Sequence, residues 1–165
     1  MKILVLSDSH SSLSFMRDCI RLTRPDGVIH LGDYYEDGLV IARENVALPF
    51  WQVPGNCDRY RLGGEEPESL LITPGGVRLL ITHGHRQYVK SGCGALLAQA
   101  RQQGAAAALF GHTHAPLCQL TEDGIWLLNP GSCGYFGGSA GMICIENGKI
   151  SSCRLFRQQE LEEMV

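Results

Sequence analysis

The sequence lacks the features that mark disulfide-linked, secreted or membrane-spanning proteins. It has no CxxC pair, and its seven cysteines are an odd number scattered along the chain. The first apolar run, 3–6, begins two residues into the sequence, so no secretory signal precedes it. The uncharged run 124–145 contains Asn129, Pro130 and six glycines, which a membrane-spanning helix would not tolerate. We therefore expect a cytoplasmic protein with reduced thiols and no membrane segment.

The chain also lacks the strong positive charge of a nucleic-acid-binding protein. Its 17 acidic and 14 basic residues give a formal net charge of −3, which argues against general nucleic-acid binding. A small phosphorylated substrate remains compatible, because bound cations would reverse the local electric field. With 165 residues, of which 44% are hydrophobic, the chain can bury one ordinary core. We expect a single domain over 1–165, with 158–165 as a polar tail that is either a short helix or disordered.

The first third of the chain alternates between predicted strands and helices. Strands are predicted at 3–6, 28–31 and 50–53, with a first helix that Ser11 or Ser12 can cap and a second one over 37–44. The second helix is predicted to bury Leu39, Val40 and Ile41. This β-α-β-α-β order predicts parallel strands with right-handed crossovers, whose carboxyl ends form the ligand-binding edge.

The remaining elements are predicted to add antiparallel pairs and one more buried strand. The predicted elements are strands 70–73 and 77–82, helix 91–103, strand 105–110, and the strand pairs 117–120 with 125–128 and 141–145 with 149–156. Asn147-Gly148 is a favoured two-residue hairpin turn between the last two strands.

Polar side chains of the metal-ligating kind follow five of the predicted strands. The candidates are Asp8, His10, Asp33, Asn56, His83, His112 and His114. Two carboxylates, one amide and four imidazoles suit manganese, iron, zinc or nickel. Each residue alone is better explained as a turn former, a helix-capping acid or a surface histidine. Five strand ends that carry only ligand-type side chains instead indicate a metal site, and seven donors fit two ions that share a carboxylate. His30 differs because it lies inside a strand, so we expect it to be a core residue.

These motifs resemble the signature blocks of the calcineurin-like metallophosphoesterases. The blocks are Asp8-x-His10, Gly32-Asp33, Gly55-Asn56-Cys57-Asp58, Thr82-His83-Gly84-His85 and Gly111-His112-Thr113-His114. Their order, the small size of the chain and the later Asn129-Pro130-Gly131-Ser132 are similar to the compact YfcE-like phosphodiesterase subgroup. The resemblance implies an α/β fold, a four-layer α/β/β/α sandwich of two mixed sheets, with two metal ions at one edge.

The resemblance also implies how the ligands divide and how the reaction proceeds. Asp8, His10 and His114 would hold the first ion, Asn56, His83 and His112 the second, and Asp33 would bridge them. The ions are expected to be divalent, with manganese favoured over nickel, zinc, iron or magnesium. A hydroxide that bridges them would attack the phosphorus of a small phosphodiester, with Asn56 as an additional donor to the charge that develops there.

One position departs from the wider superfamily, in which a histidine often follows the Gly-Asn pair. Here that position is Cys57, whose thiol is a poorer general acid for the leaving group. His85 is a candidate for the general acid in place of that histidine. The alternative is that His85 supports a metal ligand or lies on the surface. Cys57 is interpreted as a small filler or a redox-sensitive thiol, and Asp58 and Asp37 as loop or supporting residues.

The sequence leaves several functional alternatives open. A phosphomonoesterase would use the same ions, since the loops 34–37, 59–68 and 86–94 would select the substrate. A binding scaffold with this fold is the alternative from another class, which the seven retained donors disfavour. A homodimer is expected from the size of the chain and from the subgroup.

Overall fold

The protein contains two five-stranded β-sheets, in a computed structural model that describes residues 1–58, 60 and 63–163. The first sheet has the spatial order β10 (Lys149–Arg157), β9 (Ser139–Glu146), β1 (Lys2–Leu6), β2 (Gly27–His30) and β3 (Phe50–Gln52). The second has the order β4 (Ser69–Ile72), β5 (Leu79–Thr82), β6 (Ala107–Leu109), β8 (Trp126–Asn129) and β7 (Leu117–Leu120). Each sheet mixes parallel and antiparallel pairs, as predicted.

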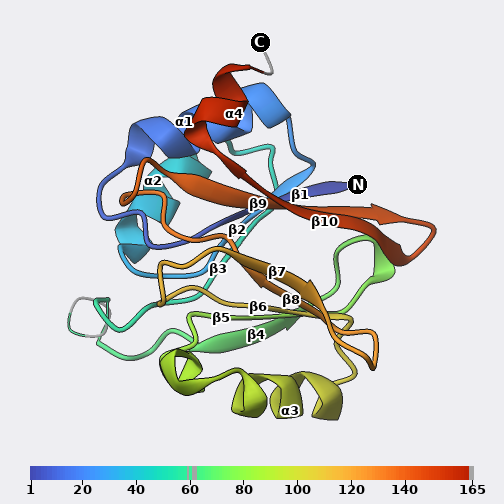
Figure 1. Ribbon diagram of the computed structural model, residues 1–165. Coiled ribbons are helices and arrows are strands. Elements are labelled where there is room, and N and C mark those ends of the chain that lie inside the picture. The colour runs from blue at the N-terminus through green and yellow to red at the C-terminus, as the bar shows by residue number, and fades with distance from the viewer. Residues whose placement is uncertain (59, 61–62, 164–165) are drawn as a thin grey trace.

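Helices cover the outer face of each sheet (Figure 1). The helices α1 (Leu13–Thr23), α2 (Tyr35–Glu44) and α4 (Gln158–Glu162) lie over the first sheet, and α3 (Gly94–Gln102) lies under the second. Two short 3-10 turns, η1 (Pro74–Gly76) and η2 (Val89–Ser91), precede β5 and α3. This arrangement confirms the predicted four-layer α/β/β/α sandwich.

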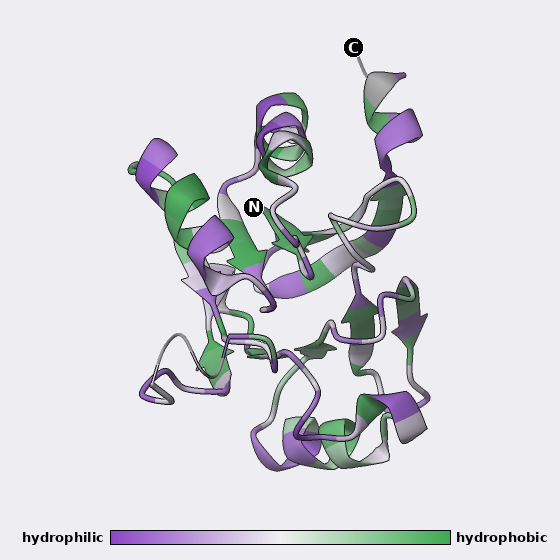
Figure 2. Ribbon diagram, turned by 90° about the vertical axis from the view of Figure 1, so that its left-hand side faces the viewer, coloured by the Kyte–Doolittle hydropathy of each residue, from purple (hydrophilic) through white to green (hydrophobic). Residues whose placement is uncertain are grey.

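The central strands are apolar because both of their faces are buried. In β1, Ile3 and Val5 point into the core between the two sheets, where they pack with residues such as Leu79 of the other sheet. Leu4 and Leu6 point the opposite way, into the core beneath the helices. Figure 2 shows this distribution, with hydrophobic colour concentrated on the strands and polar colour on the connecting loops. Burial on both faces explains why these strands read as unbroken apolar runs instead of alternating patterns.

The parallel strands bring the loops after them to one edge of the molecule. In the first sheet β1, β2 and β3 are parallel, which confirms the predicted β-α-β-α-β unit. In the second sheet β5, β6 and β8 are parallel. Hydrogen bonds cross between the sheets at this edge, for example from the backbone N–H of His112 to the Asp8 side chain at 3.1 Å. We call this edge, formed by the loops after those six strands, the carboxyl rim.

Some predictions reach beyond the described part of the chain. The predicted loop 59–68 and the predicted tail 158–165 include positions 59, 61–62 and 164–165, which lie outside the described residues. The tail was expected to be either a short helix or disordered, and its residues 158–162 form the helix α4. None of the helices among the described residues is long and apolar enough to cross a lipid bilayer.

Candidate metal centre

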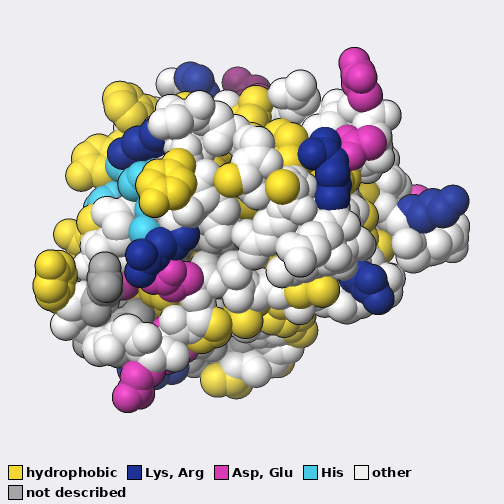
Figure 3. All heavy atoms as spheres, turned by 90° about the horizontal axis from the view of Figure 1, so that it is seen from below, with side chains coloured by type: hydrophobic (Ala, Val, Ile, Leu, Met, Phe, Trp, Pro, Cys, Tyr) yellow, Lys and Arg dark blue, Asp and Glu magenta, His cyan; other side chains and the backbone are white. Residues whose placement is uncertain are grey.

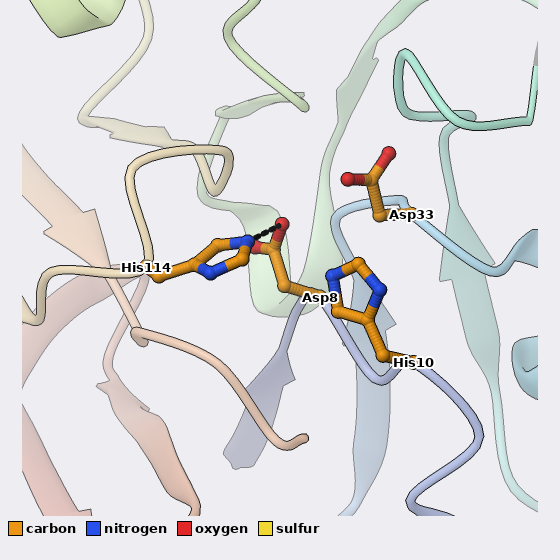
Figure 4. A group of neighbouring side chains, drawn as sticks. All are labelled: Asp8, His10, Asp33 and His114. Carbon is orange, nitrogen blue, oxygen red and sulfur yellow. Dashed lines mark ion pairs between the residues drawn. The ribbon is translucent and has the colours of Figure 1, made fainter. Parts of the chain in front are cut away.

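Four ligand-type side chains meet at the carboxyl rim. The ligand atoms of Asp8, His10, Asp33 and His114 all lie within 4.8 Å of one another (Figure 4). The Nε2 atom of His114 lies 3.1 Å from the Oδ1 atom of Asp8. Asp8 is fully buried and Asp33 is almost so, while the two histidines are partly exposed. The structure therefore places two carboxylates and two imidazoles around one point that is accessible from solvent.

The other three predicted donors lie beside this group. His83 Nε2 lies 3.5 Å from Asp33 Oδ1, 4.0 Å from Asp8 Oδ1 and 3.1 Å from Asn56 Oδ1. The ring of His112 lies 5.1 Å from that of His83, centroid to centroid. The structure thus brings all seven predicted donors to one rim, and both carboxylates lie near His83.

Five of the seven donors adopt a backbone conformation that non-glycine residues avoid. The five residues with positive φ are Asp8 at 51°, His10 at 43°, Asp33 at 55°, His112 at 67° and His114 at 56°. Each such residue costs about 1–3 kcal/mol and persists only where the surrounding structure imposes it. Strained residues of this kind cluster at functional sites, so five of them at one rim indicate such a site. The left-handed backbone changes the direction of each side chain at the end of its strand.

Two buried polar atoms of the cluster lack a hydrogen bond among the described residues. They are Oδ1 of Asp8 and Nε2 of His10. Leaving a buried polar atom unsatisfied costs about 1–3 kcal/mol, and a bound cation would remove that cost at both atoms. In the metal-free protein, burial raises the pKa of Asp8 to about 7, since an isolated carboxylate is poorly solvated there. A divalent ion would compensate for that loss of solvation, so the donor set fits a metal.

Three of the proposed histidine ligands are in the form that binds a metal. Burial lowers the pKa values of His83, His112 and His114, which keeps their rings neutral at physiological pH. The Nδ1–H of His83 donates to the carbonyl oxygen of Leu31 at 2.7 Å, so its Nε2 is left with a free lone pair facing the cluster. Neutral imidazole with one nitrogen fixed by a carbonyl is the usual state of a metal-binding histidine.

Other residues support the site without reaching the cluster. Asp58 accepts hydrogen bonds from the backbone N–H groups of Gly55 and Tyr35 at 2.8 and 2.9 Å, which fits the loop role expected for it. Asn129, at the end of β8, donates to Gly111 O at 3.0 Å and to Thr113 Oγ1 at 2.9 Å, so it shapes the loop that carries the last two histidines.

Three further predictions concern residues near the cluster. His30 is completely buried inside β2, which confirms it as a core residue, and burial lowers its pKa to about 3. Partial burial and the neighbouring Asp33 raise the pKa of Cys57 to about 11, so its thiol stays protonated. His85 lies at the rim with Nε2 4.0 Å from Glu68 and its ring 5.5 Å from that of His83.

Two aromatic residues at the site were missed by the sequence reasoning. The rings of Tyr34 and Tyr135 lie 4.9 and 4.8 Å from that of His10, and Tyr135 also stacks on His114 at 5.2 Å. Tyr34 directly follows the Gly32-Asp33 motif, and this position next to a proposed ligand could have indicated that Tyr34 lies at the site. Tyr135 lies far along the chain in a glycine-rich loop, and no local pattern connects it with His10.

A cluster of two buried Asp and two His side chains, whose ligand atoms all lie within 4.8 Å of one another, can hold a metal ion. Residues 1–147 match the calcineurin-like phosphoesterase superfamily domain, and the chain belongs to that superfamily. It is therefore a metallophosphoesterase, a hydrolase, and it belongs with the small homologues of the YfcE, MJ0936 and YsnB type.

The comparisons with known proteins cover most of the chain. It is 31% identical over 134 residues to the probable metallophosphoesterase YsnB of Bacillus subtilis, covering 80% of this chain and 75% of that protein. It is 28% identical over 154 residues to phosphodiesterase MJ0936 of Methanocaldococcus jannaschii, covering 84% and 88%. The crystal structure of Vps29 complexed with Zn²⁺ from Entamoeba histolytica has the same fold, with a TM-score of 0.72 and 20% identity over 95% of this chain and 98% of that one.

Proposed function

We propose that this hydrolase cleaves small phosphodiesters with the help of two divalent metal ions. The proposed ligands are Asp8, His10 and His114 for the first ion, Asn56, His83 and His112 for the second, and Asp33 for both. The position of Asp33 is the observation that carries this proposal. Its carboxylate belongs to the four-residue cluster and also lies 3.5 Å from the Nε2 atom of His83, so one side chain serves both donor groups.

The charges of the proposed ligands explain how two metal ions would be held and what they would do. Bound divalent ions supply Lewis-acid charge and lower the pKa of a bound water towards neutrality. Asp8 and Asp33 supply the negative charge that holds those ions, and the neutral histidines add donors without adding charge. The side-chain N–H groups of Asn56 are exposed at the rim, where they can donate to a phosphate oxygen. Manganese is the favoured metal, as mixed oxygen and nitrogen donors suit it, with nickel, zinc, iron and magnesium as alternatives.

His85 is proposed to protonate the leaving oxygen. It lies on the same rim, with its ring 5.5 Å from that of His83 and 6.2 Å from that of His112. Its Nε2 atom lies 4.0 Å from the carboxylate of Glu68, which also pairs with Arg86. His85→Ala should therefore slow alkyl diesters about 10²-fold or more, and activated aryl diesters much less. Equal losses on the two classes would exclude this role.

A phosphodiester is favoured over a monoester because a hollow adjoins the four-residue cluster. This hollow of about 300 Å³ is lined in part by His114, and a second one of about 440 Å³ is lined in part by Thr113 and shares Pro116 with the first. A diester carries a second substituent, and the hollow beside His114 gives that substituent a place. The relative MJ0936 is named a phosphodiesterase, which supports the same choice.

The proposal is tested by comparing two aryl substrates in the presence of manganese. Purified protein should hydrolyse bis(4-nitrophenyl) phosphate faster than 4-nitrophenyl phosphate and lose the activity after metal removal with a chelator. Asp33→Asn should lower turnover of the diester at least 10²-fold, since a bridging carboxylate is lost. Faster hydrolysis of the monoester would indicate a phosphomonoesterase. If the protein neither binds metal nor hydrolyses either substrate, the scaffold alternative would be favoured.

The expected homodimer and the expected cytoplasmic location stay predictions. Light scattering of the purified protein would give the mass of the particle and so decide between monomer and dimer.

A further inference from the structure

A small hollow lined by aromatic rings opens directly beside the first donor group. It has a volume of about 300 Å³, and we call it the aromatic hollow. Its lining residues are His114, Pro116, Tyr135, Phe136, Ser139 and Arg157. In Figure 3 the histidines are visible at one edge of the face shown, with hydrophobic side chains and clusters of Lys and Arg next to them. A volume of this size accommodates one ring system and not a large ligand.

Tyr135 is fixed against the donor group by the backbone that carries it. Its ring stacks on His114 with a centroid distance of 5.2 Å and an interplanar angle of 17°. Its backbone N–H donates to Ser132 Oγ at 3.0 Å, and that hydroxyl donates to the carbonyl oxygen of Asp8 at 2.7 Å. Hydrogen bonds through Ser132 therefore hold Tyr135, which forms one wall of the hollow, against the segment that carries the proposed ligand Asp8.

Phe136 extends into solvent beside this wall. Its side chain is 87% exposed, and its ring lies 6.4 Å from that of Tyr135. Its backbone φ of 54° lies in the left-handed region, which costs free energy for a bulky residue. An exposed ring buries little apolar surface, so packing in the folded protein does not offset the strain of this backbone conformation. We therefore explain Phe136 by a contact with a ligand.

Arg157 adds donor groups to the lining of the hollow. Its side chain is exposed and makes no ion pair with any other described residue. A planar guanidinium can stack on a ring or donate to the carbonyl oxygens at its edge. The hollow thus combines a flat apolar face with a polar, positively charged edge, which is the chemistry of a nucleobase and not of an alkyl chain.

We propose that the aromatic hollow binds the base of a nucleoside substituent, so that the substrate is a nucleoside-bearing phosphodiester. The base stacks on Phe136 and Tyr135 while Arg157 donates to its edge. The phosphate then lies at the donor groups, because His114 belongs both to the hollow and to the four-residue cluster. This inference rests on the proposed phosphodiesterase function and names its substrate class.

Two diesters with the same leaving group test the inference. Thymidine 5′-(4-nitrophenyl phosphate) and methyl 4-nitrophenyl phosphate both release 4-nitrophenolate when water attacks phosphorus, and only the retained substituent differs. With manganese-loaded protein the thymidine diester should have a KM at least about tenfold lower. Phe136→Ala should raise that KM about tenfold, the usual effect of losing one stacking ring, and leave the methyl diester unchanged. Phe136→Trp should restore the low KM.

Leu120 provides a control for the loss of an exposed apolar side chain. It is 51% exposed, lies at the end of the edge strand β7, and does not line the aromatic hollow. Leu120→Ala should leave both KM values unchanged. Equal KM values for the two diesters in the original protein, or equal changes in both after Phe136→Ala, would overturn the inference.

A binding measurement separates this inference from the proposed function. Thymidine 5′-phosphate and deoxyribose 5-phosphate differ only in the base, and calorimetry should show about tenfold tighter binding of the former, lost in Phe136→Ala. If neither diester is hydrolysed, the phosphodiesterase proposal is wrong. In that case a preference for the base that depends on Phe136 would still support the hollow as a base site, and equal binding of the two phosphates would overturn it.

Discussion

The carboxylate of Asp37 on α2 accepts a hydrogen bond from the hydroxyl of Ser9 at 2.8 Å. The same Oδ2 atom accepts the backbone N–H of Ser11, also at 2.8 Å. His10 lies between these two donors with a φ of 43°, in the left-handed region. A buried side chain on the second helix therefore holds the strained loop that presents a proposed metal ligand from the first strand.

Replacing Asp37 should weaken metal binding without touching a ligand. Asp37→Ala removes both hydrogen bonds, so His10 can relax to a less strained conformation away from the cluster. Residues that orient ligands typically contribute 10–100-fold to metal affinity, and we expect a loss of about that size. Calorimetric titration of the metal-free protein with Mn²⁺ measures it. Asp123→Ala is the control, because the exposed Asp123 pairs with Arg101 and with the hydroxyl of Thr121 instead of with a residue of the rim. An unchanged affinity in Asp37→Ala would show that His10 needs no such support.

The helix that carries Asp37 also shows where prediction from the sequence failed, although a supporting role for Asp37 was one of the expectations. The second helix was expected over 37–44 with Leu39 and Val40 buried. It begins at Tyr35, leaves those two side chains half-buried, and buries Asp37 and Ile41. Counting apolar residues assigns an acid to the outer face, since the hydrogen bonds that reward its burial come from a different loop.

Features that depend on neighbouring residues were predicted well. The turn at Asn147-Gly148 has φ values of 52° and 71°, as a favoured two-residue hairpin requires. The helix predicted over 91–103 is shorter, α3 at 94–102, because the 3-10 turn η2 ends at Ser91 and Gly92 follows it with a φ of 134°. The donors could be predicted because each follows its own apolar run. The Tyr135 contact could not, since it depends on how the loop after β8 folds over β1.

Gly55 is predicted to be irreplaceable because its missing side chain leaves room for Asp33. A Cβ atom at Gly55 would lie 2.8 Å from the Cγ atom of Asp33 and closer still to Oδ1. Gly55→Ala should therefore displace the carboxylate that both donor groups share and lower Mn²⁺ affinity by about tenfold or more. Equilibrium dialysis with metal analysis measures the loss.

Gly94 supplies the comparison for that substitution. A Cβ atom there has no described neighbour within 4 Å, and the residue begins α3, where alanine is favoured over glycine. Gly94→Ala should leave metal affinity unchanged and keep or slightly raise the thermal midpoint. Full metal affinity in Gly55→Ala would mean that Asp33 has another position from which to bind.

The two histidines of the loop after β6 should serve different ions. The His114 ring lies 5.4 Å from that of His10, whereas the His112 ring lies 5.1 Å from that of His83. His114→Ala should therefore empty mainly the first site and His112→Ala mainly the second, each leaving about one ion per chain. Metal analysis gives the number of ions, and anomalous scattering from crystals of each variant gives their positions. Loss of both ions in both variants would indicate a single cooperative site.

His30 should make the metal-free protein sensitive to acid. Burial lowers its pKa to about 3 in the folded protein, whereas an unfolded histidine titrates near ~6.5. Between these values the unfolded chain binds one proton that the folded chain does not, so the free energy of unfolding falls as the pH falls. The contribution is at most about 1.4 kcal/mol per pH unit. His30→Gln removes it, so urea unfolding in the presence of a chelator should depend less steeply on pH between 4 and 6.

Ser9→Ala separates this effect from a general loss of packing. It removes the hydroxyl 3.2 Å from His30 Nε2 but leaves the imidazole buried in β2. Because burial is the largest cause of the low pKa, the Ser9→Ala protein should keep the steep dependence on pH even if its stability falls. A slope that is the same in His30→Gln and in the original protein would mean that other buried groups, with His83 foremost, take up the proton. The difference in slope, and not the stability at any one pH, therefore assigns the acid sensitivity to this buried imidazole.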